Sequence, residues 1–180
     1  INNMGNILRT QGKYEEALRM YERALAIKEK THGEGCIQSA DTIGNMGAIL
    51  ETQGKYEEAL RMYERALAIY EKTHGKGHVS TAPTCINIGI VNDGKGDHAA
   101  ALRSYSRAAE IAAAAQGKNN MVSAWSLALS AVTHTALGGT DEAAEAASCM
   151  GAATAMLKAM TGNMAAAVGV LQVVLSGKEA

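Results

Sequence analysis

The amino-acid sequence predicts an all-α protein built from repeated pairs of antiparallel helices, and two observations predict it. First, residues 11–35 and 53–77 differ at only two positions, so the sequence repeats itself with a 42-residue period. Second, apolar residues within each repeat recur every three or four residues, the periodicity of one helical face. Internal similarity at a fixed period is the signature of repeat architectures. With 4% aromatic residues and many alanines, the composition also disfavours an all-β fold.

Each repeat is expected to hold two helices joined at a glycine. In the second repeat, the first helix is expected between Thr42 and Gln53, and its apolar face carries Ile43, Met46 and Leu50. A Gly-Lys pair then breaks the helix. From Tyr56, small and apolar residues recur at helical spacing to about Thr73, where the second helix is expected to end. The four expected turns are marked by Gly12, Gly54, Gly96 and Gly138.

This pattern predicts four helix pairs, of which the last two have drifted from the repeat. The pairs are expected at 1–35, 40–77, 82–117 and 120–160. Residues 161–180 are expected to form a C-terminal capping helix and tail, because terminal repeats are usually atypical. The stretch 164–175 carries no charge. It can therefore be the core face of the cap, a contact for self-association, or the surface on which missing residues continue.

Charge and cysteine usage exclude several classes of protein. The chain has 17 Lys and Arg against 18 Asp and Glu, so it lacks the basic excess of a nucleic-acid-binding protein. No membrane span is expected, because the uncharged run after Lys158 is shorter than the roughly 20 apolar residues a span needs. The three cysteines form no Cys-x-x-Cys pair, which indicates reduced thiols and a cytoplasmic location. The first residue is Ile, which suggests a piece of a longer protein.

The second repeat resembles the tetratricopeptide repeat. The consensus positions of that repeat hold Ile43, Met46, Gly47, Leu50, Gly54, Tyr56, Ala59, Leu60, Tyr63, Ala66 and Leu67. The first repeat carries the same pattern from Ile1 to Leu25. The usual repeat is about 34 residues long, and a 42-residue period is similar to that of kinesin light chains. Asn-apolar-Gly triplets at Asn3, Asn45 and Asn87 belong to the same resemblance, which is strong over 1–115 and weak over 120–160.

The resemblance implies how the helices pack. Gly47 and Ala59 are expected to let paired helices approach closely, and Tyr63 is expected to fill the space between repeats. The whole array is then a right-handed superhelical solenoid, in which the first helices line a concave groove. The expected peptide-binding residues on that face are Asn3, Asn6, Thr10, Asn45, Ala48, Thr52, Asn87 and Ile90.

A row of asparagines along this groove predicts binding to a peptide backbone. An asparagine offers both hydrogen-bond donors and an acceptor, so Asn3, Asn45 and Asn87 can bind an extended peptide without reading its sequence. The alternative is that each asparagine merely caps or bridges neighbouring helices. The row stops at Leu129 in the fourth repeat. Trp125 and Val132 can make that end apolar, although a lone tryptophan is more often a core residue than a binding residue.

The charges narrow the expected ligand. Arrays that bind acidic chaperone tails use two asparagines and a set of basic residues. Asn6 and Asn45 match the amides, but the basic positions hold Asn2, Pro83 and Asn87. No binding of chaperone tails is therefore expected. Arg9 is the basic residue on the predicted groove face, and the acidic residues Glu51 and Asp93 oppose its charge. These charges favour a neutral, apolar or weakly basic peptide.

No feature of the sequence predicts catalysis, a cofactor or a metal site. His32 and His74 share one repeat position at the end of a second helix, where a histidine can act as a C-terminal cap. His74 and His78 have a ligand-like spacing, but no further ligand completes a zinc site in sequence. Cys85 occupies a position that the repeat reserves for a small apolar residue, so it is expected to be buried.

These features favour a protein–protein interaction scaffold or adaptor that binds an extended peptide in its concave groove. Two other interpretations stay open. The repeats can be a regulatory module of a larger multidomain enzyme or NTPase, or a structural array that self-associates through its C-terminal helix.

Overall fold

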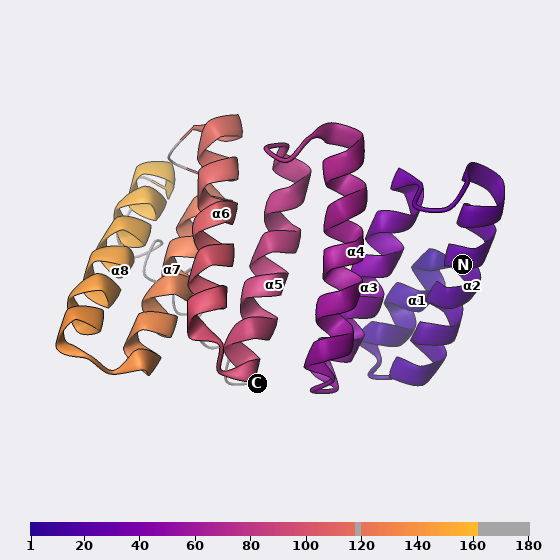
Figure 1. Ribbon diagram of the computed structural model, residues 1–180, viewed down its shortest axis with the longest axis horizontal. Coiled ribbons are helices and arrows are strands. Elements are labelled where there is room, and N and C mark those ends of the chain that lie inside the picture. The colour runs from indigo at the N-terminus through magenta and orange to yellow at the C-terminus, as the bar shows by residue number, and fades with distance from the viewer. Residues whose placement is uncertain (118–119, 162–180) are drawn as a thin grey trace. The chain divides into compact units, whose positions relative to one another are not determined.

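A computed structural model describes residues 1–117 and 120–161, and within them it holds eight α-helices, one short 3-10 helix and no strand (Figure 1). The helices are α1 (Asn2–Thr10), α2 (Tyr14–His32), α3 (Ile37–Thr52), α4 (Tyr56–His74), η1 (Val79–Thr81), α5 (Ala82–Lys95), α6 (His98–Gln116), α7 (Met121–Leu137) and α8 (Thr140–Thr161). The prediction of an all-α fold is confirmed. The expected cap at 161–180 lies outside the described residues, apart from the last residue of α8.

The repeat period governs where the second helices begin. Helices α2, α4, α6 and α8 start at the equivalent positions of the four repeats, namely Tyr14, Tyr56, His98 and Thr140. Before each start lies a glycine with a positive φ, and the four angles are 73°, 71°, 83° and 75° at Gly12, Gly54, Gly96 and Gly138. Residues with a side chain rarely adopt this backbone conformation. The glycines therefore reverse the chain between the two helices of each repeat.

The chain divides into two compact units, Ile1–His78 and Val79–Ala180, and each is described by itself. In the first unit, α1 packs on α2, α2 on α3, and α3 on α4. In the second unit, α5 packs on α6, α6 on α7, and α7 on α8, while η1 lies against α5 and α6 (Figure 1). Each unit thus holds two repeats and three successive helix–helix contacts.

A tyrosine at the centre of each of the first three second helices packs on a glycine of the preceding helix. Tyr21, Tyr63 and Tyr105 are 0%, 1% and 0% exposed. A Cβ placed on Gly47 would lie 2.9 Å from the ring of Tyr63, so only glycine lets α3 and α4 approach this closely. Tyr21 also packs with Ile49 of α3 in the next repeat. The expected close approach at Gly47 is confirmed, and the packing of Tyr21 on Ile49 also fills space between repeats.

Helix α3 begins earlier than the sequence predicts. It was expected from Thr42, yet it starts at Ile37. The reason is that Ile37 and Ala40 extend the apolar face of Ile43 toward the N-terminus, and they pack into the same cluster as Ala66 of α4. Burial of these residues stabilises the additional helical turn. Among the described helices, none is long and apolar enough to cross a membrane.

Candidate functional site

The predicted peptide-binding residues of the first unit lie on α1 and α3. Asn3, Thr10 and Thr52 are exposed, whereas Asn6, Asn45 and Ala48 are half-buried. Their spacing of three and four residues puts each set on one face of its helix. The hydroxyls of Thr10 and Thr52 donate to carbonyls of their own helices, at 2.7 and 2.9 Å. Both hydroxyl oxygens keep the capacity to accept a hydrogen bond from another molecule.

A three-residue cluster of Asn6, Tyr21 and Asn45, which we call the Asn6 cluster, joins α1, α2 and α3. Oδ1 of Asn6 accepts a hydrogen bond from the Tyr21 hydroxyl at 2.6 Å and from Nδ2 of Asn45 at 3.3 Å. Asn45 thus bridges neighbouring first helices through Asn6, as in the alternative interpretation of the asparagine row. The bridge uses one of the two N–H donors of Asn45, so the amide retains a donor and an acceptor for a ligand.

A second polar chain in the first unit runs from Lys28 through the buried hydroxyl of Thr42 to Asn2. Nζ of Lys28 donates to the Thr42 hydroxyl at 2.7 Å, and that hydroxyl donates to Oδ1 of Asn2 at 3.0 Å. The sequence analysis placed Asn2 at a position that is basic in chaperone-binding arrays, and it did not consider Lys28 as a neighbour of Asn2. The sequence did mark this position, because the first repeat has Lys28 where the second has Tyr70, and this is one of only two differences between residues 11–35 and 53–77.

Arg9 lies beside Tyr21 of the Asn6 cluster. Burial raises the pKa of the Tyr21 hydroxyl, and the neighbouring Arg9 guanidinium offsets part of that rise. Glu51, the carboxylate expected to oppose Arg9, accepts a hydrogen bond from the Tyr63 hydroxyl at 2.8 Å, and the charge of Arg9 acts on the same hydroxyl. Burial raises the pKa of Glu51, and the bond from Tyr63 lowers it by a smaller amount.

The equivalent face of the second unit is more apolar. Asn87 and Ile90 are both half-buried. Ile90 packs against a cluster that contains Tyr105 and Leu129. Because Ile90 and Leu129 occupy the repeat positions of Asn6 and Asn45, the polar bridge of the first unit is replaced here by hydrophobic packing. Ile90, expected to face a ligand, therefore also contributes to the core.

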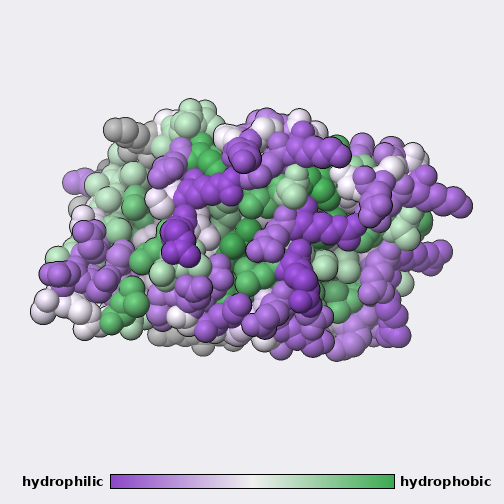
Figure 2. All heavy atoms as spheres, in the orientation of Figure 1, coloured by the Kyte–Doolittle hydropathy of each residue, from purple (hydrophilic) through white to green (hydrophobic). Residues whose placement is uncertain are grey.

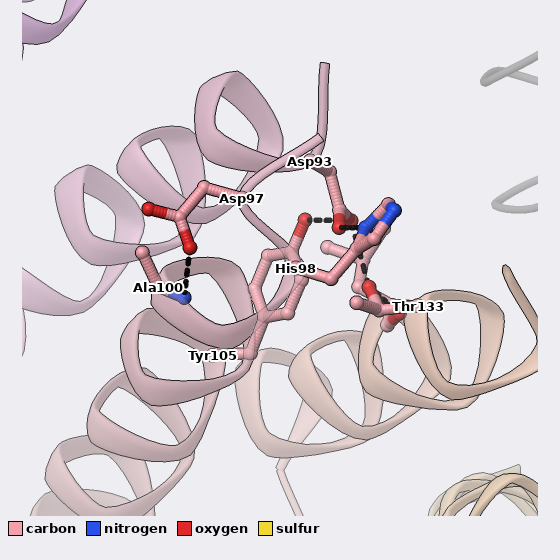
Figure 3. Close-up of polar contacts among 7 residues, drawn as sticks. Asp93, Asp97, His98, Ala100, Tyr105 and Thr133 are labelled. Atoms are coloured by element: carbon pink, nitrogen blue, oxygen red, sulfur yellow. Dashed lines mark hydrogen bonds and ion pairs between the residues drawn. The ribbon is translucent and has the colours of Figure 1, made fainter. Parts of the chain in front are cut away.

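Three side chains that the sequence analysis did not connect meet at Asp93 (Figure 3). Oδ2 of Asp93 accepts from the hydroxyls of Tyr105 at 3.0 Å and Thr133 at 2.7 Å. Its Oδ1 lies 3.0 Å from Nδ1 of His98. These bonds connect α5, α6 and α7. Tyr105 and Thr133 are at most 1% exposed, so the hydroxyls cannot reach a substrate in solvent. The arrangement is that of a structural network rather than of a catalytic one.

Two expectations about single residues have opposite outcomes. Cys85 is buried, as predicted. Trp125, expected to be a core residue, is 43% exposed, and that expectation is wrong. The repeat explains the error, because the equivalent positions hold the exposed residues Asp41 and Pro83. The described residues contain no group of three or more His, Cys, Asp or Glu side chains placed to hold a metal ion.

Together, the paired helices, the 42-residue period and the glycine–tyrosine contacts define an α-helical repeat protein. A family model for the tetratricopeptide repeat matches residues 1–72 and 38–114. These matches span more than half of the sequence, so the chain belongs to the tetratricopeptide-repeat family. No curated protein matches the sequence.

Two solved structures show the type of repeat. BtubC (BKLC) from P. vanneervenii is similar over 89% of this chain, with 22% identity and a TM-score of 0.79. A Podosopora anserina putative kinesin light chain with nearly identical TPR-like repeats is similar over 99% of this chain and 91% of that chain, with 18% identity and a TM-score of 0.74. The present chain spans 63% of the BtubC chain. The fold is therefore of the kinesin-light-chain-like type, as predicted.

Proposed function

We propose that this chain is a scaffold or adaptor that binds an extended peptide segment of a partner protein along its first helices. Tetratricopeptide repeats are in general protein-interaction modules, and the family assignment supports a protein partner. The observation that carries the proposal is the polar face of α1 and α3, where exposed Asn3, Thr10 and Thr52 accompany the Asn6 cluster.

The chemistry of this face suits a peptide backbone. Each peptide unit presents one N–H donor and one C=O acceptor. The amides of Asn3 and Asn45 can complement both groups, and the hydroxyls of Thr10 and Thr52 can accept from N–H groups. Backbone bonds of this kind give affinity, and the side chains of the ligand then determine specificity.

The charges of the first unit favour a ligand that is neutral where it crosses α1 and α3. Arg9 lies beside Tyr21, and the Lys28 ammonium donates to the buried hydroxyl of Thr42. Glu51 and Arg9 both act on the Tyr63 hydroxyl, so their charges offset each other there. A neutral peptide is among the ligands expected from the sequence.

A peptide-array screen of the purified chain tests the proposal. The triple variant Asn3/Asn45/Asn87→Ala is compared with wild type, and Thr31/Thr73→Ala serves as the control. Thr31 and Thr73 are exposed hydroxyl residues near the ends of α2 and α4. We expect wild type and control to bind the same neutral peptides, and the triple variant to lose at least ten-fold in affinity while it keeps its helical circular dichroism.

The proposal fails if no peptide binds, or if the triple variant binds as well as the control does. Equal binding by the triple variant would mean that the asparagines only bridge helices, as Asn45 bridges to Asn6. A cytoplasmic location belongs to the same proposal, and the three free cysteines support it, because thiols stay reduced in that compartment.

A self-associating array is the second candidate, and exposed apolar residues of the second unit favour it. Met121 and Trp125 are 42% and 43% exposed and lie four residues apart on α7. Sedimentation velocity at increasing concentration separates the two candidates, since a peptide adaptor stays monomeric and a structural array gains mass.

A further inference from the structure

The second unit contains a pocket whose lining includes residues smaller than their equivalents in the first unit. It has a volume of about 460 Å³ and lies between α6 and α8, with α7 as its floor. Its apolar lining comes from Leu102, Ala109 and Leu127. Pockets that bind small molecules usually measure roughly 300–1,000 Å³. On the face shown in Figure 2, hydrophilic and hydrophobic side chains are intermingled over the helices of both units.

Three residues that line this pocket are smaller than their equivalents in the first unit. The equivalent positions on α2, α3 and α4 hold Leu25, Met46 and Arg65. Leu25 packs against the cluster of Ile43, and Met46 packs against the cluster of Tyr21. The guanidinium of Arg65 lies 2.6 Å from Glu29 and so ties α4 to α2.

In the second unit, each of these side chains is replaced by a small one. Two repeats further along the sequence, the equivalent positions hold Ala109, Ser130 and Cys149. The partner of the ion pair is lost as well, because Ala113 stands in the place of Glu29. Ala109, Ser130 and Cys149 all line the pocket. The three lining positions thus carry smaller side chains in the second unit than in the first.

The floor of the pocket is lined by hydrogen-bond acceptors. The buried hydroxyl of Ser126 donates to the carbonyl of Val122 at 2.9 Å, and the buried hydroxyl of Ser130 donates to the carbonyl of Ser126 at 3.0 Å. Each hydroxyl has one hydrogen, so its oxygen can meet an incoming group only as an acceptor. At the rim, the exposed side chain of Arg103 can stack on the face of an aromatic ring.

We propose that this pocket binds a small, flat aromatic molecule that carries one N–H donor. The ring fills the pocket, its N–H donates to Ser126 or Ser130, and Arg103 covers its exposed face. The site is separate from the polar face of α1 and α3, so it does not depend on peptide binding there.

Cys149 supplies a direct test, because its thiol lines the pocket and is half-buried. Indole is the probe, and the alkylation rate of each cysteine by iodoacetamide is followed by mass spectrometry at alkaline pH. Cys36 is an internal control, since it lies in the first unit just before α3. We expect millimolar indole to slow alkylation of Cys149 at least five-fold and to leave Cys36 unchanged.

A matched ligand and matched variants show where the probe binds. 1-Methylindole lacks the N–H donor and should protect Cys149 about five-fold less well, the worth of one hydrogen bond of roughly 1 kcal/mol. The double variant Ala109→Leu/Ser130→Met restores the side chains of the first unit and should abolish protection. Ala114→Leu makes the same change as Ala109→Leu, but at an exposed position of α6, and should keep the protection.

The proposal is overturned if indole leaves the Cys149 rate unchanged, or if the filled double variant is protected as well as wild type. Equal protection by indole and 1-methylindole would refute the proposed hydrogen bond from the ligand N–H group to a serine hydroxyl at the floor of the pocket. A thermal melt of the filled variant shows that it is folded, so loss of protection cannot be ascribed to unfolding.

Discussion

At the scale of single residues, the contact between a glycine and a tyrosine sets the spacing of each of the first three helix pairs. Gly5, Gly47 and Gly89 each face the ring of the tyrosine sixteen residues later. The contact is short because a glycine has no Cβ, and the tyrosine ring buries its area against the exposed backbone of the facing helix. The consensus pattern of the repeat revealed both residues, and only the structure shows that they touch.

The variant Gly47→Ala is expected to destabilise the protein by about 1–2 kcal/mol. An added Cβ would lie 2.9 Å from the Tyr63 ring, and overpacking of this kind typically costs about 1–3 kcal/mol. Gly44→Ala in the same helix is the control, because its Cβ meets no atom within 4 Å and alanine favours the helix by about 1 kcal/mol. Urea denaturation of both variants should shift the midpoint in opposite directions. A stabilised Gly47→Ala variant would contradict the packing described.

The half-buried carboxyl of Glu51 makes stability depend on pH. Burial raises its pKa above the ordinary value of 4.5, so the folded state holds the proton more tightly than the unfolded state does. The stabilisation is therefore complete below pH 4.5 and is lost as the pH rises through the folded-state pKa.

The variant Glu51→Gln should remove this dependence while it keeps an acceptor for the Tyr63 hydroxyl. Thermal melts between about pH 4 and 8 measure the difference between variant and wild type. The variant should gain stability relative to wild type as the pH rises. A difference that stays constant over the range, or that changes in the other direction, would show that Glu51 is not buried as described.

At the scale of helices, Asp93 holds three of them together. It lies near the end of α5 and accepts hydrogen bonds from Tyr105 of α6 and Thr133 of α7 (Figure 3). Nearby Asp97 has a simpler task, because it caps α6 by accepting from the backbone N–H of Ala100 at 3.0 Å. The two aspartates lie four residues apart, so they allow a comparison within one short segment.

The variant Asp93→Ala should cost about 1–3 kcal/mol, because the buried Tyr105 hydroxyl loses its bond to Asp93, whereas Thr133 keeps a bond to the Leu129 carbonyl. Asp97→Ala removes a helix cap and should cost about 1 kcal/mol. Guanidinium unfolding of the two variants measures both values. If Asp97→Ala proved the more damaging of the two, the role assigned to Asp93 would be wrong.

Helix positions were predictable to the extent that local signals mark them. The second helices begin where predicted, because a glycine with positive φ precedes each start at a fixed spacing. The start of α3 was missed by five residues, since Ile37 and Ala40 are helical through packing on α4 rather than through a local signal. The exposure of Trp125 was missed because the interpretation followed the usual burial of tryptophan and did not use the repeat position, whose equivalents are exposed.

At the scale of the whole molecule, the repeat family could be read from the sequence, whereas the candidate binding face could be read only in outline. The period and consensus residues identify the family that the comparisons confirm. The sequence placed Asn6 and Asn45 on one face, but the bond between them joins two different repeats and has no local signature. The same holds for Lys28, which reaches Thr42 from a different helix. The pocket beside Cys149 is lined by residues spread over three helices.

The central claim is that the first helices bind an extended peptide, and amide NMR of the asparagine-labelled chain tests it most directly. The probe is the strongest peptide from the array, titrated into the full chain. The account predicts that the side-chain amide signals of Asn3, Asn6 and Asn45 shift in proportion to bound peptide, while the signal of Asn120, which is buried at the start of α7, stays in place. Shifts at Asn120 without shifts at the three asparagines of the first unit would contradict the account.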